Sequence, residues 1–288
     1  MKNNIEKYLD HLKHRNLSAK TIRIRRYALR EFHKIYKDKR VQDITEKDII
    51  NYANQISDLR ESTQYIRMCG LKLFFKWLEK SFIIFSDPMA DITMKKPPKY
   101  IPRTLSPEQI DTVIESVDTS EMFGVRDRAF LELLYSTGAR RGEVLNMKIK
   151  DVNFIQRLIT ITGKGNKQRT VPVGETALKW LKNYLHVRPK GKNQNDLWLT
   201  SDGDKMQEHI ADQLFKKIRK NTGINCSSHT LRRSCATHLL QNGMHPSFIA
   251  ELLGHASSAS LKHYLKVEIE ELKETQSLLG GNELWKQL

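Results

Sequence analysis

The sequence is poor in cysteine and in long apolar runs, and each shortage excludes a class of protein. Three cysteines among 288 residues, Cys69, Cys226 and Cys235, are too few and too scattered for a disulfide framework, which favours a reducing cytoplasm. Apolar runs last only a few residues, so we expect no segment that could cross a bilayer. The charged N-terminal stretch MKNNIEKYLDHLKHRN is unlike a secretory signal. The composition therefore predicts a soluble cytoplasmic protein.

Acidic residues are also in short supply. The chain has 49 Lys and Arg residues against 33 Asp and Glu residues, a net charge of +16. Residues 1–100 hold 22 basic and 12 acidic residues, and residues 101–288 hold 27 basic and 21 acidic residues. A positive field over both parts suits a polyanion such as nucleic acid, although a basic balance can also serve solubility alone.

The first 90 residues have helical periodicity and no strand signal. Apolar residues recur at the spacing of one helix face between Ile5 and Leu12. A second helix is expected after an N-cap at Ser18, and others after Thr45 and Ser62. The predicted buried stripe of the second helix is Ile24, Ala28, Phe32 and Ile35. Residues 1–90 are therefore interpreted as a helical bundle with a basic surface.

A basic stretch with three prolines follows. Residues 91–104, DITMKKPPKYIPRT, cannot be helical through their prolines and are predicted to form an extended linker. Such a linker either follows a phosphate backbone or is simply solvated.

A second domain, residues 105–279, mixes helices with a small sheet. Ser106 and Gln109 predict a capping box at its first helix, and Gly138 predicts the end of a later helix. Two β-branched runs around a Gly/Asn turn predict a hairpin over 158–173, with Lys164 near its tip. Helices resume from Glu175 and fill nearly everything after residue 206. The predicted fold is therefore mainly α with a small β-sheet, in two domains.

Polar, mostly basic residues gather in five stretches of this second domain: TGARRGEVL, GKGNKQR, HTLRR, LLGH and SASLKHYLKV. Their chemically capable residues are Arg140, Arg141, Glu143, Lys164, Lys167, Arg169, His229, Arg232, His255 and Tyr264. Taken singly, each has an ordinary explanation as a surface ion pair, a polar turn, an interior histidine or a packed tyrosine.

Taken together, the same residue types suit the transfer of a phosphodiester. Guanidinium groups can clamp non-bridging phosphate oxygens, and an imidazole can add a hydrogen bond. A lysine can protonate the departing alkoxide, and a tyrosine hydroxyl can be the nucleophile. The sequence offers no carboxylate pair suited to two catalytic metals.

The order and spacing of these stretches resemble the tyrosine recombinase (phage integrase) family, closest in style to the Xer-type site-specific recombinases. The resemblance covers about 125 residues with all boxes in order. It implies that the catalytic residues are Arg140, Lys164, His229, Arg232, His255 and the nucleophile Tyr264, with Glu143 in support. Arg233 stands where the Xer type often has a histidine, which leaves the subfamily open.

The family further implies a helical, SAM-like core-binding domain and a mixed catalytic domain that close around duplex DNA. Cleavage would pass through a 3′-phosphotyrosine, and four protomers would exchange strands through a Holliday junction without metal or cofactor. The tail at residues 280–288 resembles the C-terminal helix that such proteins dock into a neighbouring protomer; it could instead fold onto its own domain. Candidate DNA contacts are Arg23, Arg25, Arg26, Arg30, Lys95, Lys96, Lys99, Lys167 and Arg169.

Three other interpretations remain open at this point. Cys226-x-x-His229 and Cys235-x-x-His238 could be zinc ligands, although only five residues separate the two pairs. The stretch from His245 could belong to a helix-turn-helix of a DNA-binding protein without catalysis. A type IB topoisomerase would use the same phosphotyrosine chemistry to relax supercoiled DNA.

Overall fold

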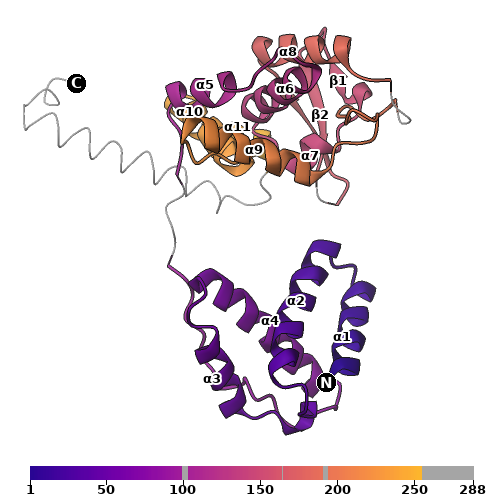
Figure 1. Cartoon of the computed structure of the whole chain (residues 1–288), viewed down its shortest axis with the longest axis vertical. Coiled ribbons are helices and arrows are strands. Elements are labelled where there is room, and N and C mark those ends of the chain that lie inside the picture. The colour runs from indigo at the N-terminus through magenta and orange to yellow at the C-terminus, as the bar shows by residue number, and fades with distance from the viewer. Residues whose placement is uncertain (99–102, 164, 191–193, 255–288) are drawn as a thin grey trace, which may run out of the picture. The chain divides into compact units, whose positions relative to one another are not determined.

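The computed structural model of the protein describes residues 1–98, 103–163, 165–190 and 194–254. The chain forms two compact parts, which we call the N-terminal unit (residues 1–100) and the C-terminal unit (residues 101–288) (Figure 1). Each unit has a hydrophobic core of its own.

The N-terminal unit has helices and no strand among its described residues. Phe32 is central to its core and meets the rings of Tyr52 and Phe75 edge to face, at centroid distances of 5.1 and 6.0 Å. As predicted, a helix follows Thr45, whose hydroxyl caps it by accepting a hydrogen bond from the backbone N–H of Asp48 at 3.4 Å. The elements are α1 (Lys2–His14), α2 (Ala19–Ile35), η1 (Val41–Asp43), α3 (Glu46–Gln55) and α4 (Glu61–Lys80).

The buried stripe predicted for α2 is partly wrong. Ala28 and Phe32 are buried, but Ile24 and Ile35 are 41% and 43% exposed. Ile22 and Leu29 are buried instead. The helix packs against α1 and α4, and it approaches α4 closely, since a Cβ at Gly70 would lie only 3.0 Å from the Cβ of Ala28. The helix α4 also begins at Glu61, so Ser62 lies inside it and does not cap it.

In the C-terminal unit, α6 packs against α8 and against α10, so it lies in the middle of the unit (Figure 1). No helix in the described part of the chain is both long and apolar enough to cross a membrane. The elements are α5 (Pro107–Glu115), α6 (Met122–Thr137), α7 (Arg141–Leu145), η2 (Ile149–Asp151), β1 (Val152–Asn153), β2 (Leu158–Thr162), β3 (Gln168–Pro172), α8 (Glu175–Val187), α9 (Glu208–Thr222), α10 (Ser228–Gln241) and α11 (Pro246–Leu253).

Two predicted helix ends in this unit are confirmed. The Ser106 hydroxyl accepts from the Gln109 backbone N–H at 3.3 Å, and the Ser106 N–H donates to Oε1 of Gln109 at 3.1 Å, which completes the capping box. Gly138 ends α6 with φ +57°, a left-handed conformation that glycine adopts without steric penalty.

The hairpin is present as an antiparallel pair of β2 and β3, with Ile159 opposite Val171 and Ile161 opposite Arg169. A third strand, β1, pairs with β2 and was not predicted, because two residues are too short to show an alternating pattern. Ile159, Ile161 and Val171 are buried, so one face of the hairpin covers the core.

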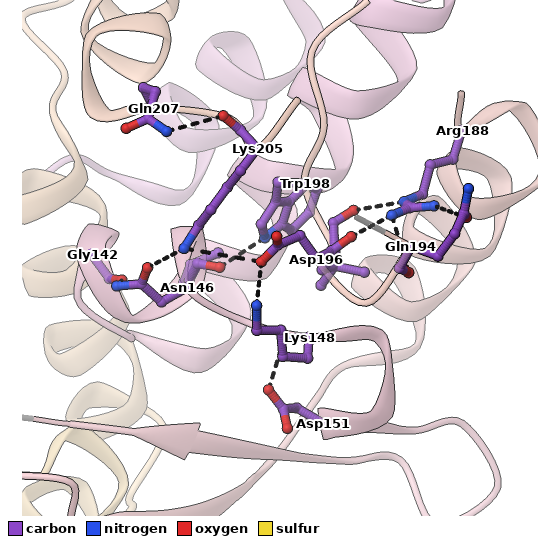
Figure 2. Close-up of polar contacts among 12 residues, drawn as sticks. Gly142, Asn146, Lys148, Asp151, Arg188, Gln194, Asp196, Trp198, Lys205 and Gln207 are labelled. Atoms are coloured by element: carbon purple, nitrogen blue, oxygen red, sulfur yellow. Dashed lines mark hydrogen bonds and ion pairs between the residues drawn. The ribbon is translucent and has the colours of Figure 1, made fainter. Parts of the chain in front are cut away.

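The segment between α8 and α9 is hydrogen-bonded to α7 and to the residues that follow α7 (Figure 2). Asp196 is buried and accepts a hydrogen bond from Nζ of Lys148 at 2.5 Å. The indole of Trp198, which is fully buried, donates to the backbone carbonyl of Val144 in α7 at 2.8 Å. These contacts hold α7, the helix that carries Glu143, in a fixed place.

Candidate active site

The turn between α6 and α7 places Arg140 and Glu143 beside each other. Oε2 of Glu143 accepts from the Arg140 backbone N–H, and Oε1 accepts from Nη1 of Arg140, both at 2.9 Å. The Glu143 side chain is only 7% exposed, whereas that of Arg140 is 45% exposed. A buried carboxylate therefore holds a guanidinium group that can still reach a ligand.

Glu143 remains ionised although it is buried. Burial alone would raise its pKa, because it disfavours the charged form. Hydrogen bonds from Arg169 and from Arg140 outweigh that effect and hold the pKa of Glu143 below its ordinary value. At neutral pH the side chain is a carboxylate that can orient both arginines.

The second predicted arginine, Arg232, lies on α10 and is 5% exposed. Its Nη1 donates to the backbone carbonyl of Gly138 at 2.6 Å, and its Nη2 donates to the carbonyl of Leu253 at 2.8 Å. Arg232 thus connects the C-terminal ends of α6 and α11. His229 precedes it by three residues, in the first turn of the same helix, and is exposed.

Three arginines from separate stretches converge on the end of α11. The last carbonyl groups of a helix have no partner within the helix, so they accept hydrogen bonds readily from cations. The carbonyl of Leu252 accepts from Nε of Arg169 at 2.8 Å, and that of Gly254 lies 3.5 Å from Nη2 of Arg140. With Arg232 on Leu253, consecutive carbonyl groups bind three guanidinium groups. The chain continues from this point into His255.

Several predicted site residues lie outside the described residues, namely Lys99, Lys164, His255, Tyr264 and the tail 280–288. The structure therefore brings together Arg140, Glu143 and Arg232. The roles of all six catalytic candidates remain predictions.

The predicted DNA contacts differ in exposure. Arg23, Arg30, Lys95, Lys96 and Lys167 are exposed. Arg25 and Arg26 are half-buried, and Arg26 lies 3.7 Å from a carboxylate oxygen of Glu6. Arg169 is 15% exposed and is bound to Glu143, which the sequence interpretation missed. The period-2 alternation of β3 was a signal for it, because it places Arg169 on the same face as the apolar Val171.

In the part of the chain that the structure describes, no three His, Cys, Asp or Glu side chains form a group that could hold a zinc ion. Burial raises the pKa of Cys226 and of Cys235 to about 12. Both thiols are therefore protonated at neutral pH.

Two family models match the chain. Residues 103–271 match the Phage integrase family, and residues 3–83 match the N-terminal SAM-like domain of phage integrases. The chain belongs to the phage integrase family of tyrosine recombinases. The helical N-terminal unit and the mixed C-terminal unit follow that family's two domains.

Relatives match over nearly the whole of this tyrosine recombinase. It is 33% identical to tyrosine recombinase XerC 2 of Ralstonia nicotianae over 274 residues, which cover 89% of this chain and 79% of the relative. It is 34% identical to tyrosine recombinase XerD of Listeria monocytogenes over 276 residues, 90% of this chain and 92% of the relative.

Solved structures share the fold. The XerH site-specific recombinase bound to its palindromic difH substrate superposes with a TM-score of 0.78 at 24% identity, over 96% of this chain and 84% of that one. A lambda integrase dimer bound to a COC′ core site gives a TM-score of 0.74 at 19% identity, over 92% and 76% of the two chains.

Proposed function

We propose that this tyrosine recombinase cuts and rejoins a specific site in duplex DNA, with Tyr264 as the nucleophile. The observation that carries the proposal is the convergence of Arg140 and Arg232 on consecutive carbonyl groups at the end of α11. Guanidinium groups held this close together can bind the two non-bridging oxygens of one phosphate.

The chemistry assigned to each residue follows from charge. The phenol of Tyr264 loses its proton to solvent as its oxygen attacks the scissile phosphorus, and a 3′-phosphotyrosine forms while the bond to the 5′ oxygen breaks. Lys164 gives a proton to that departing oxygen. Negative charge on the phosphate rises from one to about two in the transition state, so the pair Arg140 and Arg232 binds the transition state more tightly than the substrate.

The remaining site residues either orient these arginines or bind the same phosphate. Glu143 fixes the direction of the Arg140 guanidinium by accepting a hydrogen bond from its Nη1, while the other carboxylate oxygen accepts from the Arg140 backbone N–H. His229 and His255 add hydrogen bonds to the phosphate oxygens. The 5′-hydroxyl of a second duplex then attacks the phosphotyrosine, which releases Tyr264 and exchanges the strands without a loss of bond energy.

Four protomers act on two sites, through a Holliday junction. The names of the Ralstonia and Listeria relatives support recombination over the relaxation of supercoils by a type IB topoisomerase. The complete set of six reactive residues argues against a DNA-binding protein without catalysis. The proposed place of action is the cytoplasm, with which the free thiols of Cys69, Cys226 and Cys235 agree.

The experiment that tests the proposal is the trapping of a covalent protein–DNA adduct. Nicked duplexes carrying a random core are incubated with the full chain, and those that form an adduct resistant to denaturing detergent are recovered and amplified. With the recovered duplex, Tyr264→Phe should form no adduct, because phenylalanine has no hydroxyl, and should keep its affinity for the duplex.

The matched control is Tyr27→Phe, which removes the hydroxyl of an exposed tyrosine in α2 and should keep the adduct. An adduct that survives Tyr264→Phe at the native rate would show that another residue is the nucleophile.

A further inference from the structure

Arg169 is bound into the protein from two sides. It lies on β3 opposite Ile161, and its side chain is 15% exposed. Nη2 donates to Oε2 of Glu143 at 2.8 Å, and Nε donates to the backbone carbonyl of Leu252 at 2.8 Å. One planar guanidinium group thus connects the hairpin, α7 and the end of α11.

The end of α11 is shaped to receive this group. A Cβ at Gly254 would lie 2.9 Å from Nη1 of Arg169, 3.0 Å from its Cζ and 3.1 Å from its Nε. Gly254 also has φ +64°, a conformation that other residues adopt with strain. The missing side chain therefore gives the guanidinium its place against the helix terminus.

We propose that Arg169 is a positioning residue for strand transfer and not a contact to DNA. It locks the Glu143 carboxylate, and through that carboxylate it aims Arg140. It also fixes the terminus of α11, from which the chain continues into His255. The proposal rests on the function proposed above for Arg140 and His255, and it replaces the sequence-based assignment of Arg169 to the DNA-contacting residues.

The charges around Glu143 show why Arg169 matters to it. Among the described residues, two charged groups bond the carboxylate, Arg140 from the start of α7 and Arg169 from β3. On the hairpin side, a Cβ at Gly163 would lie 3.4 Å from Oε1, and glycine itself carries no charge. Burial raises the pKa of Glu143, and without Arg169 the strongest of the effects that oppose it would be lost.

The first measurement separates positioning from DNA contact. Binding of the full chain to a mixed-sequence 40-bp duplex is measured at several salt concentrations. A residue that neutralises a phosphate contributes about 0.9 to the slope of log affinity against log salt. Arg169→Met should leave the slope of the native chain unchanged. A slope shallower by about 0.9 would make Arg169 a phosphate contact and overturn the proposal.

The second measurement follows Glu143 itself, without DNA. Carboxyl-¹³C glutamate is incorporated into the full chain, and the Glu143 resonance is assigned by its absence from Glu143→Gln. Arg169→Met should raise the titration midpoint of Glu143 by about 1–3 pH units, because an opposite charge is lost. The matched control, Lys167→Met, removes an exposed charge from the same hairpin and should leave that midpoint in place. An unmoved midpoint in Arg169→Met overturns the proposal.

A second variant guards against misfolding. Arg169→Lys keeps the charge, so it should fold, but one amino group cannot bond Glu143 and the Leu252 carbonyl as the guanidinium does. Its Glu143 midpoint should lie between those of the native chain and Arg169→Met. If Arg169→Met does not fold, a native midpoint in Arg169→Lys overturns the proposal by itself.

The link to catalysis is tested with the duplex recovered in the trapping experiment. The adduct-forming rate of Arg169→Met, divided by the native rate, should fall as the pH is lowered from 8 to 6, because Glu143 protonates earlier. A ratio that does not change with pH overturns the role in strand transfer. An adduct that survives Tyr264→Phe would instead overturn the proposed nucleophile. The salt dependence of DNA binding and the titration of Glu143 do not need the specific DNA site, so they would still test the role of Arg169.

Discussion

Gly138 and Gly223 both end helices of the C-terminal unit in the left-handed conformation, as Gly254 does, but their surroundings differ. Gly138 ends α6 with φ +57°, and Gly223 ends α9 with φ +71°. A Cβ at Gly138 would lie 2.6 Å from Cδ2 of Leu253 and 3.3 Å from Sγ of Cys235, whereas a Cβ at Gly223 would meet nothing within 4 Å. Alanine substitutions at these two glycines therefore separate the cost of backbone strain from the cost of overpacking.

We expect Gly223→Ala to destabilise the unit by about 1 kcal/mol, the strain of a left-handed alanine. Gly138→Ala should add about 1–3 kcal/mol for overpacking, because Leu253 is fully buried and cannot move aside freely. It should also slow adduct formation, since the Gly138 carbonyl accepts a hydrogen bond from Arg232. Urea unfolding measures the loss of stability in both variants. Equal losses of stability in the two variants would contradict the packing argument.

The sequence predicts the contacts of a single residue only where the two partners are close together in the chain. Arg140 and Glu143 are three apart at a helix start, and their hydrogen bonds are local. Arg169 meets Glu143 across 26 positions of sequence, and Leu252 across 83. Alternation along β3 predicts that Arg169 faces inward, but only the folded chain shows which groups it bonds.

Among the elements, the connection between α8 and α9 depends on one buried carboxylate. Asp196 is 3% exposed and Lys148 is 35% exposed, and their side chains are 2.5 Å apart. The Lys205 amino group lies 4.0 Å from the same carboxylate oxygen and donates to Oδ1 of Asn146 (Figure 2). Asp196 therefore holds two cations beside α7.

Asp196→Ala should destabilise the C-terminal unit by about 2 kcal/mol. The effect stays below the roughly 3–5 kcal/mol of a fully buried pair because water can reach Lys148 once its partner is gone. The control is Glu175→Ala, which breaks an ion pair with Arg157 whose side chains are 80% and 58% exposed. It should change stability by less than about 1 kcal/mol. Denaturant unfolding of both variants is the measurement, and similar losses would refute the anchoring role.

Element ends were predictable where the capping chemistry lies within three or four residues, as at Thr45 and Ser106. The buried face of α2 was not, because Ile24 and Ile22 are equally apolar and the packing of α2 against α1 and α4 buries the second. Sequence periodicity gives the width of an apolar stripe, while its direction is set by the partner helix.

At the scale of the whole molecule, the two units differ in their excess of basic residues, and each unit has a hydrophobic core of its own. The N-terminal unit holds 22 basic and 12 acidic residues, and the C-terminal unit holds 27 basic and 21 acidic residues. Each unit has its own buried cluster, centred on residues such as Phe74 and Leu9 in the first and Phe130 and Trp198 in the second. We propose that they are separate domains that bind one duplex together.

The fragments 1–100 and 101–288 should therefore each fold alone and unfold cooperatively in urea, which circular dichroism can follow. Each should bind a mixed-sequence duplex more weakly than the full chain, with a shallower dependence on salt, because each neutralises only part of the phosphates. Tethering makes the second contact intramolecular, so the full chain should bind at least about 100-fold more tightly than the better fragment. If one fragment carried the whole affinity and salt slope of the full chain, binding by two domains would be wrong, and the excess positive charge of the other would serve solubility only.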